Sequence, residues 1–267
     1  MKRKIMRAAV LVACVMLIFL LAACEPAAPK PYELPESPYV PEDFTYEGAY
    51  LTCSAGSVIT GIDVSSHQGV IDWQAVADAG ILYAFVRLGY RGYSNGDLME
   101  DTMAQQNLAG AKAAGIAVGA YFFSQAVNVE EALAEAAYAM ELLGDFQLDL
   151  PLVYDWEYVN DTARTADVDA RTLTDCTLAF CRAVESQGFD AMIYFNTHQI
   201  KNLLYGQELE MYPWWLAKYD HAMAFPCRVD MWQYSNQGSV PGIAGQVDLN
   251  VMFADYGLGK TWLDILS

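Results

Sequence analysis

From Val58 onward, short apolar runs rich in Val, Ile, Tyr and Phe alternate with helical segments that end near a glycine. Near-continuous apolar runs are typical of strands buried on both faces, as in a parallel sheet of β/α units. No glycine-rich nucleotide loop follows the first run, which favours a closed barrel over an open sheet. We expect strands at residues 58–64, 82–88, 116–123, 152–156, 191–195, 214–218, 228–233 and 246–250, and helices at residues 72–79, 98–114, 129–143 and 170–187.

The chain length suits one such barrel. A (β/α) barrel typically needs about 250 residues, and the chain has 267. Hydrophobic residues make up 54% of the chain, which is enough for a large core and excludes disorder along its whole length. We therefore predict a single α/β barrel domain over residues 58–267.

The N-terminus has the layout of an export signal. Four basic residues precede an apolar run at residues 8–23 that is too short and too one-sided for a stable membrane span. The run ends in Leu21-Ala22-Ala23-Cys24, which resembles a bacterial lipobox, in which the cysteine is diacylated. We expect a lipoprotein signal at residues 1–23 and a lipid anchor on Cys24 at the outer face of a Gram-positive cell membrane. An ordinary signal peptide with a chance cysteine is the alternative.

Residues 24–57 hold six prolines and are predicted to form an extended tether. The chain carries a formal charge of −18, and losing the four basic residues of the signal leaves it more acidic still. Such a surface repels nucleic acid, so we expect no nucleic-acid partner. We also expect a monomer, no cofactor and no metal, since neither a CxxC motif nor a histidine cluster is present. Disulfides and free thiols both remain open for Cys53, Cys176, Cys181 and Cys227.

Carboxylates lie where several predicted strands end. In a (β/α) barrel the active site lies at the carboxyl ends of the strands. Asp63, Asp248 and the pair Asp155 and Glu157 all occupy such positions. Asp155 and Glu157 are two residues apart, so a strand places both on one face and Trp156 on the other. Two close carboxyl groups retain a proton to higher pH, and glycoside hydrolysis needs a protonated acid beside an anion. Solvated loop carboxylates or helix caps are the alternative.

The stretches around these carboxylates form an ordered set of motifs: residues 61–69 (GIDVSSHQG) with 71–73 (IDW), 85–90 (FVRLGY), 119–124 (GAYFFS), 151–157 (PLVYDWE), 215–219 (WLAKY), 232–235 (WQYS) and 242–250 (GIAGQVDLN). In this order they resemble the motifs of glycoside hydrolase family 25, the Chalaropsis-type lysozymes or muramidases. The resemblance extends from about residue 59 to residue 253. One departure is Phe122, because many members have histidine after the tyrosine of the third strand.

This resemblance implies an irregular, flattened TIM-like (β/α) barrel that hydrolyses peptidoglycan. The implied bond is the β-1,4 link from N-acetylmuramic acid to N-acetylglucosamine. Glu157 matches the general acid of the family, Asp155 and Asp63 match the carboxylates that assist it, and Asp248 matches a further acidic residue. Either a carboxylate attacks the sugar, or the N-acetyl group of the substrate attacks with Asp155 supporting it.

Other residues at strand ends are candidates for substrate binding. Core packing is the alternative for each aromatic side chain. Arg87 is predicted to pair with a site carboxylate, and capping of a strand is its alternative. His67 fits substrate binding and loop support equally. We interpret His198 and His221 as surface residues, and Glu130, Glu131, Glu135 and Glu141 as a solvated helix face. The substrate-binding candidates are Tyr121, Tyr194, Trp215, Tyr219, Gln233 and Arg87.

Two other functions remain open. The first is a surface lipoprotein that binds glycans without cutting them, although a retained Asp-x-Glu pair argues against it. The second is a polysaccharide deacetylase on a similar barrel. Deacetylases usually hold a metal with His and Asp, and only three scattered histidines are present here.

Overall fold

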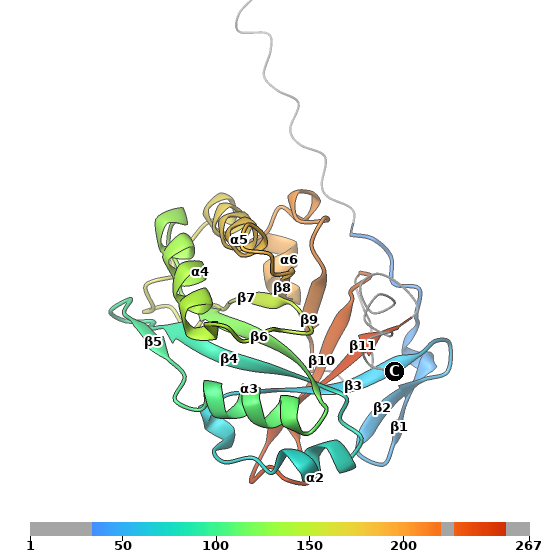
Figure 1. Ribbon diagram of the computed structural model, residues 1–267. Coiled ribbons are helices and arrows are strands. Elements are labelled where there is room, and N and C mark those ends of the chain that lie inside the picture. Colours follow the sequence, from blue (N-terminus) through green and yellow to red (C-terminus); the bar gives the residue numbers. More distant parts are fainter. Residues whose placement is uncertain (1–33, 220–226, 255–267) are drawn as a thin grey trace, which may run out of the picture. The chain divides into compact units, whose positions relative to one another are not determined.

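The computed structural model describes residues 34–219 and 227–254, and eight of the strands in those residues close into a barrel (Figure 1). The order around the barrel is β3, β11, β10, β9, β8, β7, β6 and β4, and β3 pairs with β4 to close it. The barrel predicted from the sequence is therefore confirmed. Its strands are β3 (Val58–Val64), β4 (Tyr83–Arg91), β6 (Ala117–Ser124), β7 (Leu152–Trp156), β8 (Ala191–Asn196), β9 (Trp214–Ala217), β10 (Met231–Gly238) and β11 (Val247–Phe253).

The helices lie outside the barrel. α4 (Val129–Leu143) and α5 (Ala170–Glu185) pack on each other and cover strands β6 to β8, together with α6 (Thr197–Asn202). α2 (Trp73–Asp78) and α3 (Ala104–Ala113) lie on the opposite side (Figure 1). Short 3-10 turns occur at Pro41–Asp43, Ser66–Gln68 and Gly206–Glu208. In the described residues these five α-helices are fewer than the eight of a regular (β/α)₈ barrel, which fits an irregular barrel.

Local sequence signals explain most helix boundaries. Side chains of Asp72, Asn128 and Asp169 accept hydrogen bonds from backbone N–H groups in the first turns of α2, α4 and α5. α4 ends at Gly144, whose positive φ of 54° a residue with a Cβ rarely adopts. The predicted helix at residues 98–114 is wrong in its first part. Leu98–Glu100 instead forms β5, which pairs antiparallel with the end of β4, and the helix begins only at Ala104.

The sheet is mixed, so the expectation of an all-parallel sheet is also wrong. β11 runs antiparallel to both of its neighbours, β10 and β3, whereas the other barrel pairs are parallel. The long turn between β10 and β11 makes a hairpin, which needs no crossover helix. As a result, β11 begins at the end of the barrel where the parallel strands finish.

The segment predicted as an extended tether is folded where the structure describes it. β1 (Phe44–Glu47) and β2 (Tyr50–Cys53) form an antiparallel hairpin. The ring of Tyr39 stacks on Phe253 at 5.1 Å, and Phe44 meets Trp232 edge to face. Aromatic residues among and after the prolines bury apolar area, which outweighs the preference of the prolines for an extended chain. The predicted lipoprotein signal and Cys24 lie outside the described residues.

Aromatic rings fill the inside of the barrel. The rings of Tyr83 and Phe85 lie across Gly61 and Gly119 of the neighbouring strands. A Cβ at either glycine would come within 2.3 Å of the ring, so only glycine fits at these two positions. Tyr194, Trp215 and Tyr121 complete this core at one end of the barrel, where they form the floor of the site described below.

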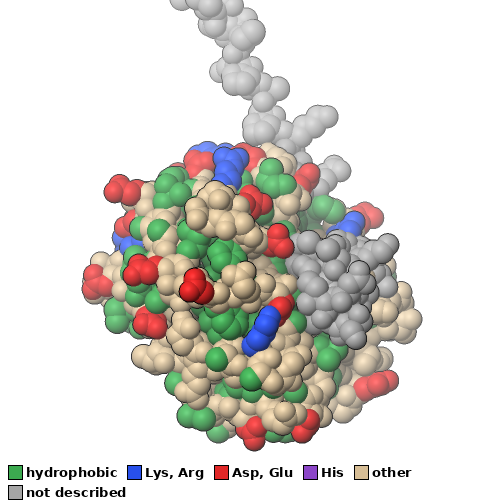
Figure 2. Space-filling model, viewed as in Figure 1, with side chains coloured by type: hydrophobic (Ala, Val, Ile, Leu, Met, Phe, Trp, Pro, Cys, Tyr) green, Lys and Arg blue, Asp and Glu red, His purple; other side chains and the backbone are tan. Residues whose placement is uncertain are grey.

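The outer surface carries no single charged patch on the face seen in Figure 2, where acidic side chains are scattered and basic ones are few. The acidity therefore does not mark out a binding surface on that face. Among the residues that the structure describes, no helix has the length and apolar character needed to span a membrane.

Candidate active site

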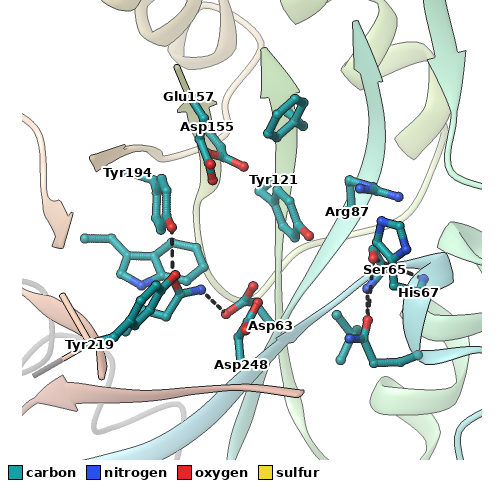
Figure 3. A pocket seen from close by; sticks show the side chains of 15 residues that line it. Asp63, Ser65, His67, Arg87, Tyr121, Asp155, Glu157, Tyr194, Tyr219 and Asp248 are labelled. Atoms are coloured by element: carbon teal, nitrogen blue, oxygen red, sulfur yellow. Dashed lines mark hydrogen bonds between the residues drawn. The ribbon is translucent and has the colours of Figure 1, made fainter. Parts of the chain in front are cut away.

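A cavity of about 210 Å³ opens at the mouth of the barrel (Figure 3). The structure brings together all ten residues that the sequence indicated for catalysis or substrate binding. It adds five others that sequence reasoning had left undecided or missed: Val64, Ser65, His67, Gln68 and Phe123. The ten predicted residues that line the cavity are Asp63, Arg87, Tyr121, Asp155, Glu157, Tyr194, Trp215, Tyr219, Gln233 and Asp248.

The topology explains why carboxyl groups from distant segments meet here. Asp63 lies near the end of β3, and Asp155 and Glu157 lie at the end of β7. Asp248 is the second residue of β11, and it reaches the same mouth because β11 runs in the opposite direction. The sequence therefore predicted the meeting of these side chains correctly, although Asp248 lies at the beginning of its strand.

Strand alternation sets the direction of the acidic pair. Asp155 and Glu157 point into the cavity (Figure 3). Tyr154 and Trp156 point outward, where Tyr154 packs on Phe180 of α5 and the indole N–H of Trp156 donates to the carbonyl of Ala126. Asp155 is only 5% exposed, and Glu157 lies closer to solvent. Asp155, which has the shorter side chain, thus lies deeper, and the longer side chain of Glu157 stands above it.

Both carboxyl groups of this pair hold a proton more firmly than in water. Burial raises the pKa of Asp155 well above its usual range, and the charges of Glu157 and Asp63 add to that rise, against an opposing effect of Arg87. Burial and then the charge of Asp63 also raise the pKa of Glu157, while hydrogen bonds from Asp155 and Tyr194 oppose the rise. Because the two groups interact directly, the pair retains a proton to higher pH than an isolated carboxyl group does.

Asp63 is surrounded by hydrogen-bond donors. Its Oδ2 atom accepts from Nε2 of Gln233 at 2.8 Å and from Nδ2 of Asn250 at 2.7 Å. Burial raises the pKa of Asp63, and hydrogen bonds from Asn250, Gln233 and Asp248 act against that rise. Burial and the charge of Asp63 raise the pKa of Asp248 to about 9. Asn250 is fully buried in β11 and had no signal in the sequence beyond its place after Asp248.

Aromatic side chains form the walls around the acids. Strand register places Phe123, Asp155, Tyr194 and Trp215 next to one another across β6, β7, β8 and β9. Tyr219 follows β9 and remains 48% exposed at the rim, with its hydroxyl donating to Gln233. Faces of aromatic rings at the edge of a polar cavity suit the apolar faces of sugar rings.

Arg87 lines the cavity. The sequence had suggested that it pairs with one of the predicted acids, but its partner is a different carboxylate. Its Nε and Nη2 atoms both contact Oδ2 of Asp101 at 2.8 Å. Asp101 is 1% exposed, and it also accepts from the backbone N–H groups of Ser66 and Met103. The guanidinium is therefore held in place from behind, and it acts on Asp155 through its charge alone.

The remaining predictions have mixed outcomes. His67 lines the cavity as an exposed residue, and His198 is exposed on α6. His221 lies outside the described residues. Phe122 is buried against Tyr138 of α4 and faces away from the cavity, so the departure from the family pattern at this position leaves the lining unchanged. Cys176 and Cys181 are buried thiols on α5.

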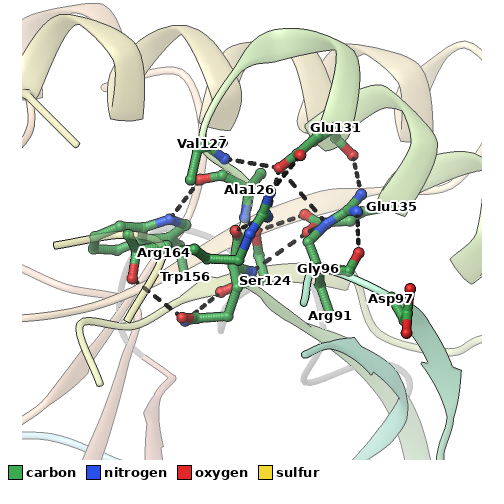
Figure 4. A network of polar contacts seen from close by, with 12 residues as sticks. Arg91, Gly96, Asp97, Ser124, Ala126, Val127, Glu131, Glu135, Trp156 and Arg164 are labelled. Atoms are coloured by element: carbon green, nitrogen blue, oxygen red, sulfur yellow. Dashed lines mark hydrogen bonds and ion pairs between the residues drawn. The ribbon is translucent and has the colours of Figure 1, made fainter. Parts of the chain in front are cut away.

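A buried polar network behind β7 holds the chain that carries the acidic pair (Figure 4). Nε2 of Gln125 donates to the carbonyl of Glu157 at 2.6 Å, and its Oε1 accepts from Thr165. Next to it, the hydroxyl of Ser124 bonds to Glu135, and Ser124 also contacts the hydroxyl of Tyr154. Three consecutive residues at the end of β6, numbers 124 to 126, thus each hold one residue at the end of β7.

An ion pair supports this network. Nε of Arg91 contacts Oε1 of Glu135 at 2.6 Å, and the side chain of Glu135 is 0% exposed. The expectation that Glu135 belongs to a solvated helix face is therefore wrong. Glu131, its neighbour one turn earlier, is partly exposed and pairs with Arg164. Gln125 and Glu135 were missed because a polar residue between apolar ones has the same pattern whether it is solvated or buried with a partner.

No group of three or more His, Cys, Asp or Glu side chains in residues 34–219 and 227–254 is arranged to hold a metal ion.

Comparison with known proteins identifies the family. The model of glycosyl hydrolases family 25 matches residues 62–243. YegX of Escherichia coli (strain K12) is 32% identical over 210 residues, which cover 74% of this chain and 70% of YegX. Lysozyme M1 of Streptomyces globisporus is 28% identical over 205 residues, covering 73% of this chain and 67% of that protein.

A solved structure agrees with this match. The modular autolysin LytC of Streptococcus pneumoniae, solved with a synthetic peptidoglycan ligand, superimposes with a TM-score of 0.64 at 27% identity. The match covers 73% of this chain but only 46% of LytC, so this chain corresponds to less than half of that autolysin. The chain belongs to glycosyl hydrolases family 25 and is a glycoside hydrolase.

Proposed function

We propose that this glycoside hydrolase is a lysozyme that cuts the β-1,4 bond between N-acetylmuramic acid and N-acetylglucosamine in peptidoglycan. The observation that carries the proposal is the meeting of four carboxyl groups within one aromatic-walled cavity. Oxocarbenium-like transition states need a proton donor and nearby negative charge, and this site offers both. The similarity to Lysozyme M1, and to an autolysin solved with a peptidoglycan ligand, supports the choice of substrate.

Glu157 is the proposed proton donor. Its longer side chain stands nearer the opening, where a glycosidic oxygen can approach, whereas Asp155 lies deeper. Transfer of the proton to the glycosidic oxygen allows the bond from that oxygen to C1 to break, with the electron pair staying on the leaving sugar. The Glu157 carboxylate then takes a proton from the water that attacks C1.

Asp155 is proposed to support the N-acetyl group of the muramic acid. Its Oδ1 atom is buried and has no hydrogen-bond partner within the part of the chain that the structure describes. An acetamide N–H would satisfy this acceptor, and holding the N–H turns the acetyl oxygen towards C1 to form a cyclic oxazolinium ion. Direct attack by a carboxylate is the alternative route.

Gln125 is expected to position Glu157. A Gln125→Met variant keeps the volume but leaves the partly buried carbonyl of Glu157 without its donor. We expect kcat to fall about 10- to 100-fold with little change in KM, because small displacements of catalytic groups slow the chemical step. Steady-state kinetics on soluble peptidoglycan fragments measure this. Gln147→Met, at an exposed glutamine, is the matched control, and an unchanged kcat in Gln125→Met would show that the contact has no role in positioning.

A release assay with dye-labelled peptidoglycan separates the proposed function from its alternatives. A lysozyme releases soluble dye in proportion to enzyme and time. A glycan-binding protein without activity would retain dye on the pellet while binding to it. A deacetylase would release acetate without soluble glycan and would lose activity with chelator, so either of these two results would refute the proposal.

We also propose that Cys24 carries a lipid that holds the enzyme at the outer face of the cell membrane. The supporting feature is the order of basic residues, apolar run, small residues and cysteine. A Cys24→Ala variant expressed in a Gram-positive host is then expected to lose incorporation of labelled palmitate and to leave the membrane fraction. Equal labelling of both proteins would exclude this anchor.

A further inference from the structure

Asp63 and Asp248 face each other directly across two antiparallel strands. They are register partners in the β3 and β11 pair, and both side chains line the cavity (Figure 3). Residues opposite one another in such a pair have Cβ atoms about 4.5–5.5 Å apart, and two like charges there are destabilising. Asp63 cannot move away easily, because it is only 6% exposed.

The hydrogen bonds around Asp63 favour the ionised form of this carboxyl group. The indole N–H of Trp215 is a donor only, and it contacts Oδ1 of Asn250 at 2.9 Å. This contact fixes the orientation of the Asn250 amide, so its NH₂ group faces Oδ2 of Asp63. Oδ2 of Asp63 therefore accepts a hydrogen bond from the Asn250 amide.

Gln233 repeats the arrangement from β10. Its Oε1 atom accepts the hydroxyls of Tyr194 at 2.9 Å and Tyr219 at 2.6 Å, so its NH₂ group also faces Oδ2 of Asp63. An oxygen that receives two N–H donors has no room for a proton of its own. Oδ2 of Asp63 therefore carries no proton, and the two N–H donors stabilise the anionic form of Asp63, with its second oxygen left for Asp248.

Within the described lining of the cavity, no permanent cation is left to compensate a second negative charge. Among the described residues that line the cavity, Arg87 carries the only permanent positive charge, and its guanidinium is already paired with Asp101. Apart from His67, the other titratable groups of the lining are carboxyl groups and tyrosines. The titratable groups that face the pair are Asp155 and Glu157 on β7, Tyr121 on β6, Tyr194 on β8, Tyr219 after β9, Arg87 on β4 and His67 after β3.

We propose that Asp248 keeps its proton at neutral pH and donates it in a hydrogen bond to an ionised Asp63, which makes Asp248 the positioning residue for that anion. The raised pKa of Asp248, about 9, agrees with this arrangement. Three donors then hold Asp63: Gln233, Asn250 and Asp248. The anion cannot rotate, and it meets the positive charge that develops on the sugar with no reorganisation.

The role of Asp248 in catalysis rests on the proposed lysozyme function, whereas its protonation state does not. As pH rises through the pKa of Asp248, its hydrogen bond is lost and a second anion appears beside Asp63. Activity should then fall on the alkaline side. A neutral Asn at position 248 donates the same hydrogen bond but cannot ionise.

The test uses the full chain, with and without substrate. In Asp248→Asn, the alkaline limb of kcat/KM is expected to move up by about one pH unit or more, with kcat at least about ten-fold above that of Asp248→Ala. Asp145→Asn, at an exposed carboxylate, should leave the profile unchanged. An unmoved alkaline limb together with equal loss in Asp248→Asn and Asp248→Ala would overturn the proposal.

Carbon-13 NMR of aspartate carboxyl groups tests the protonation state in the absence of substrate. The resonance that disappears in Asp248→Asn is expected to titrate above neutral pH, against about 3.9 for an ordinary aspartate. A midpoint below neutral pH would overturn the proposal even in an active enzyme. A midpoint above it, in an enzyme inert towards peptidoglycan, would support the proton on Asp248 while rejecting the lysozyme function.

Discussion

Replacing Glu157 with Gln is expected to lower kcat about 10³-fold while the protein stays folded, because a positioned general acid typically contributes 10²- to 10⁴-fold. The amide has the size of the carboxyl group but has no acidic proton to give to the leaving oxygen. Burial already raises the pKa of Glu157, so its carboxyl group holds a proton that the variant lacks. Substrate binding should change little, since the aromatic walls remain intact.

Kinetics with soluble peptidoglycan fragments, together with circular dichroism and a thermal melt, measure this effect. Glu141→Gln is the matched control, because Glu141 is exposed on α4 and far from the cavity lining. Substantial residual activity in Glu157→Gln would remove Glu157 from the role of proton donor. Asp155, the other acid on that strand face, would then be the first candidate to replace it.

Replacing Arg91 with Met is expected to lower the free energy of unfolding by about 3–5 kcal/mol at neutral pH, since it leaves a buried carboxylate unpaired. Glu135 is 0% exposed, and Arg91 is its partner at 2.6 Å. Nη1 of Arg91 also donates to the carbonyl of Gly96, and Nη2 donates to that of Glu131. Urea unfolding followed by tryptophan fluorescence gives the change.

The loss should depend on pH. Burial raises the pKa of Glu135 in the folded protein even with Arg91 present, and removing Arg91 raises it further. A folded pKa above the unfolded value of about 4.3 means that stability falls as pH rises between the two values. The destabilisation should therefore be smaller near pH 3, where Glu135 is almost entirely neutral in both states, than at neutral pH.

Two further variants separate an unpaired charge from a lost contact. Lys112→Met removes an exposed ion pair with Asp149 and is expected to change stability by less than about 1 kcal/mol. The double variant Arg91→Met with Glu135→Leu removes both buried charges and should recover about 2 kcal/mol of the single loss. Equal destabilisation in the single and the double variant would show that an unpaired Glu135 is not the cause.

The sequence predicted the fold where local signals and burial agree. The strands at residues 58–64 and 152–156 and the helix at residues 129–143 have the predicted bounds. In these elements the apolar period is clear, and the helix has Asn128 as its cap and Gly144 at its end. All ten site residues proposed for the cavity line it, because strand ends meet at one mouth of a barrel.

The sequence failed where tertiary contacts decide the structure. Leu98–Glu100 is a strand because β4 extends far enough to pair with it, which no local pattern reveals. Residues 34–57 look like a tether by their prolines, yet Tyr39 and Leu51 are buried against the barrel. Glu135 belongs to an Ala/Glu-rich helix, and its burial is possible only because Arg91 on strand β4 lies next to it.

The hydrogen-bond and ion-pair partners of the site residues could not be predicted from the sequence either. Arg87 was expected beside a catalytic acid, but Asp101 receives it because β5 and the turn after it bring that carboxyl group underneath. Gln125 and Asn250 hold Glu157 and Asp63 through contacts between residues 32 and 187 positions apart. Without an alignment of relatives, such pairs have no signal in one sequence.

The most direct test of the lysozyme assignment is mass spectrometry of the fragments released from purified peptidoglycan. Cleavage at the proposed bond leaves new reducing ends on N-acetylmuramic acid, which borohydride reduction marks by a fixed mass gain. We predict that every new reducing end is a muramic acid, and that Glu157→Gln releases none. New reducing ends on N-acetylglucosamine, or free peptides without new sugar ends, would contradict the proposed reaction.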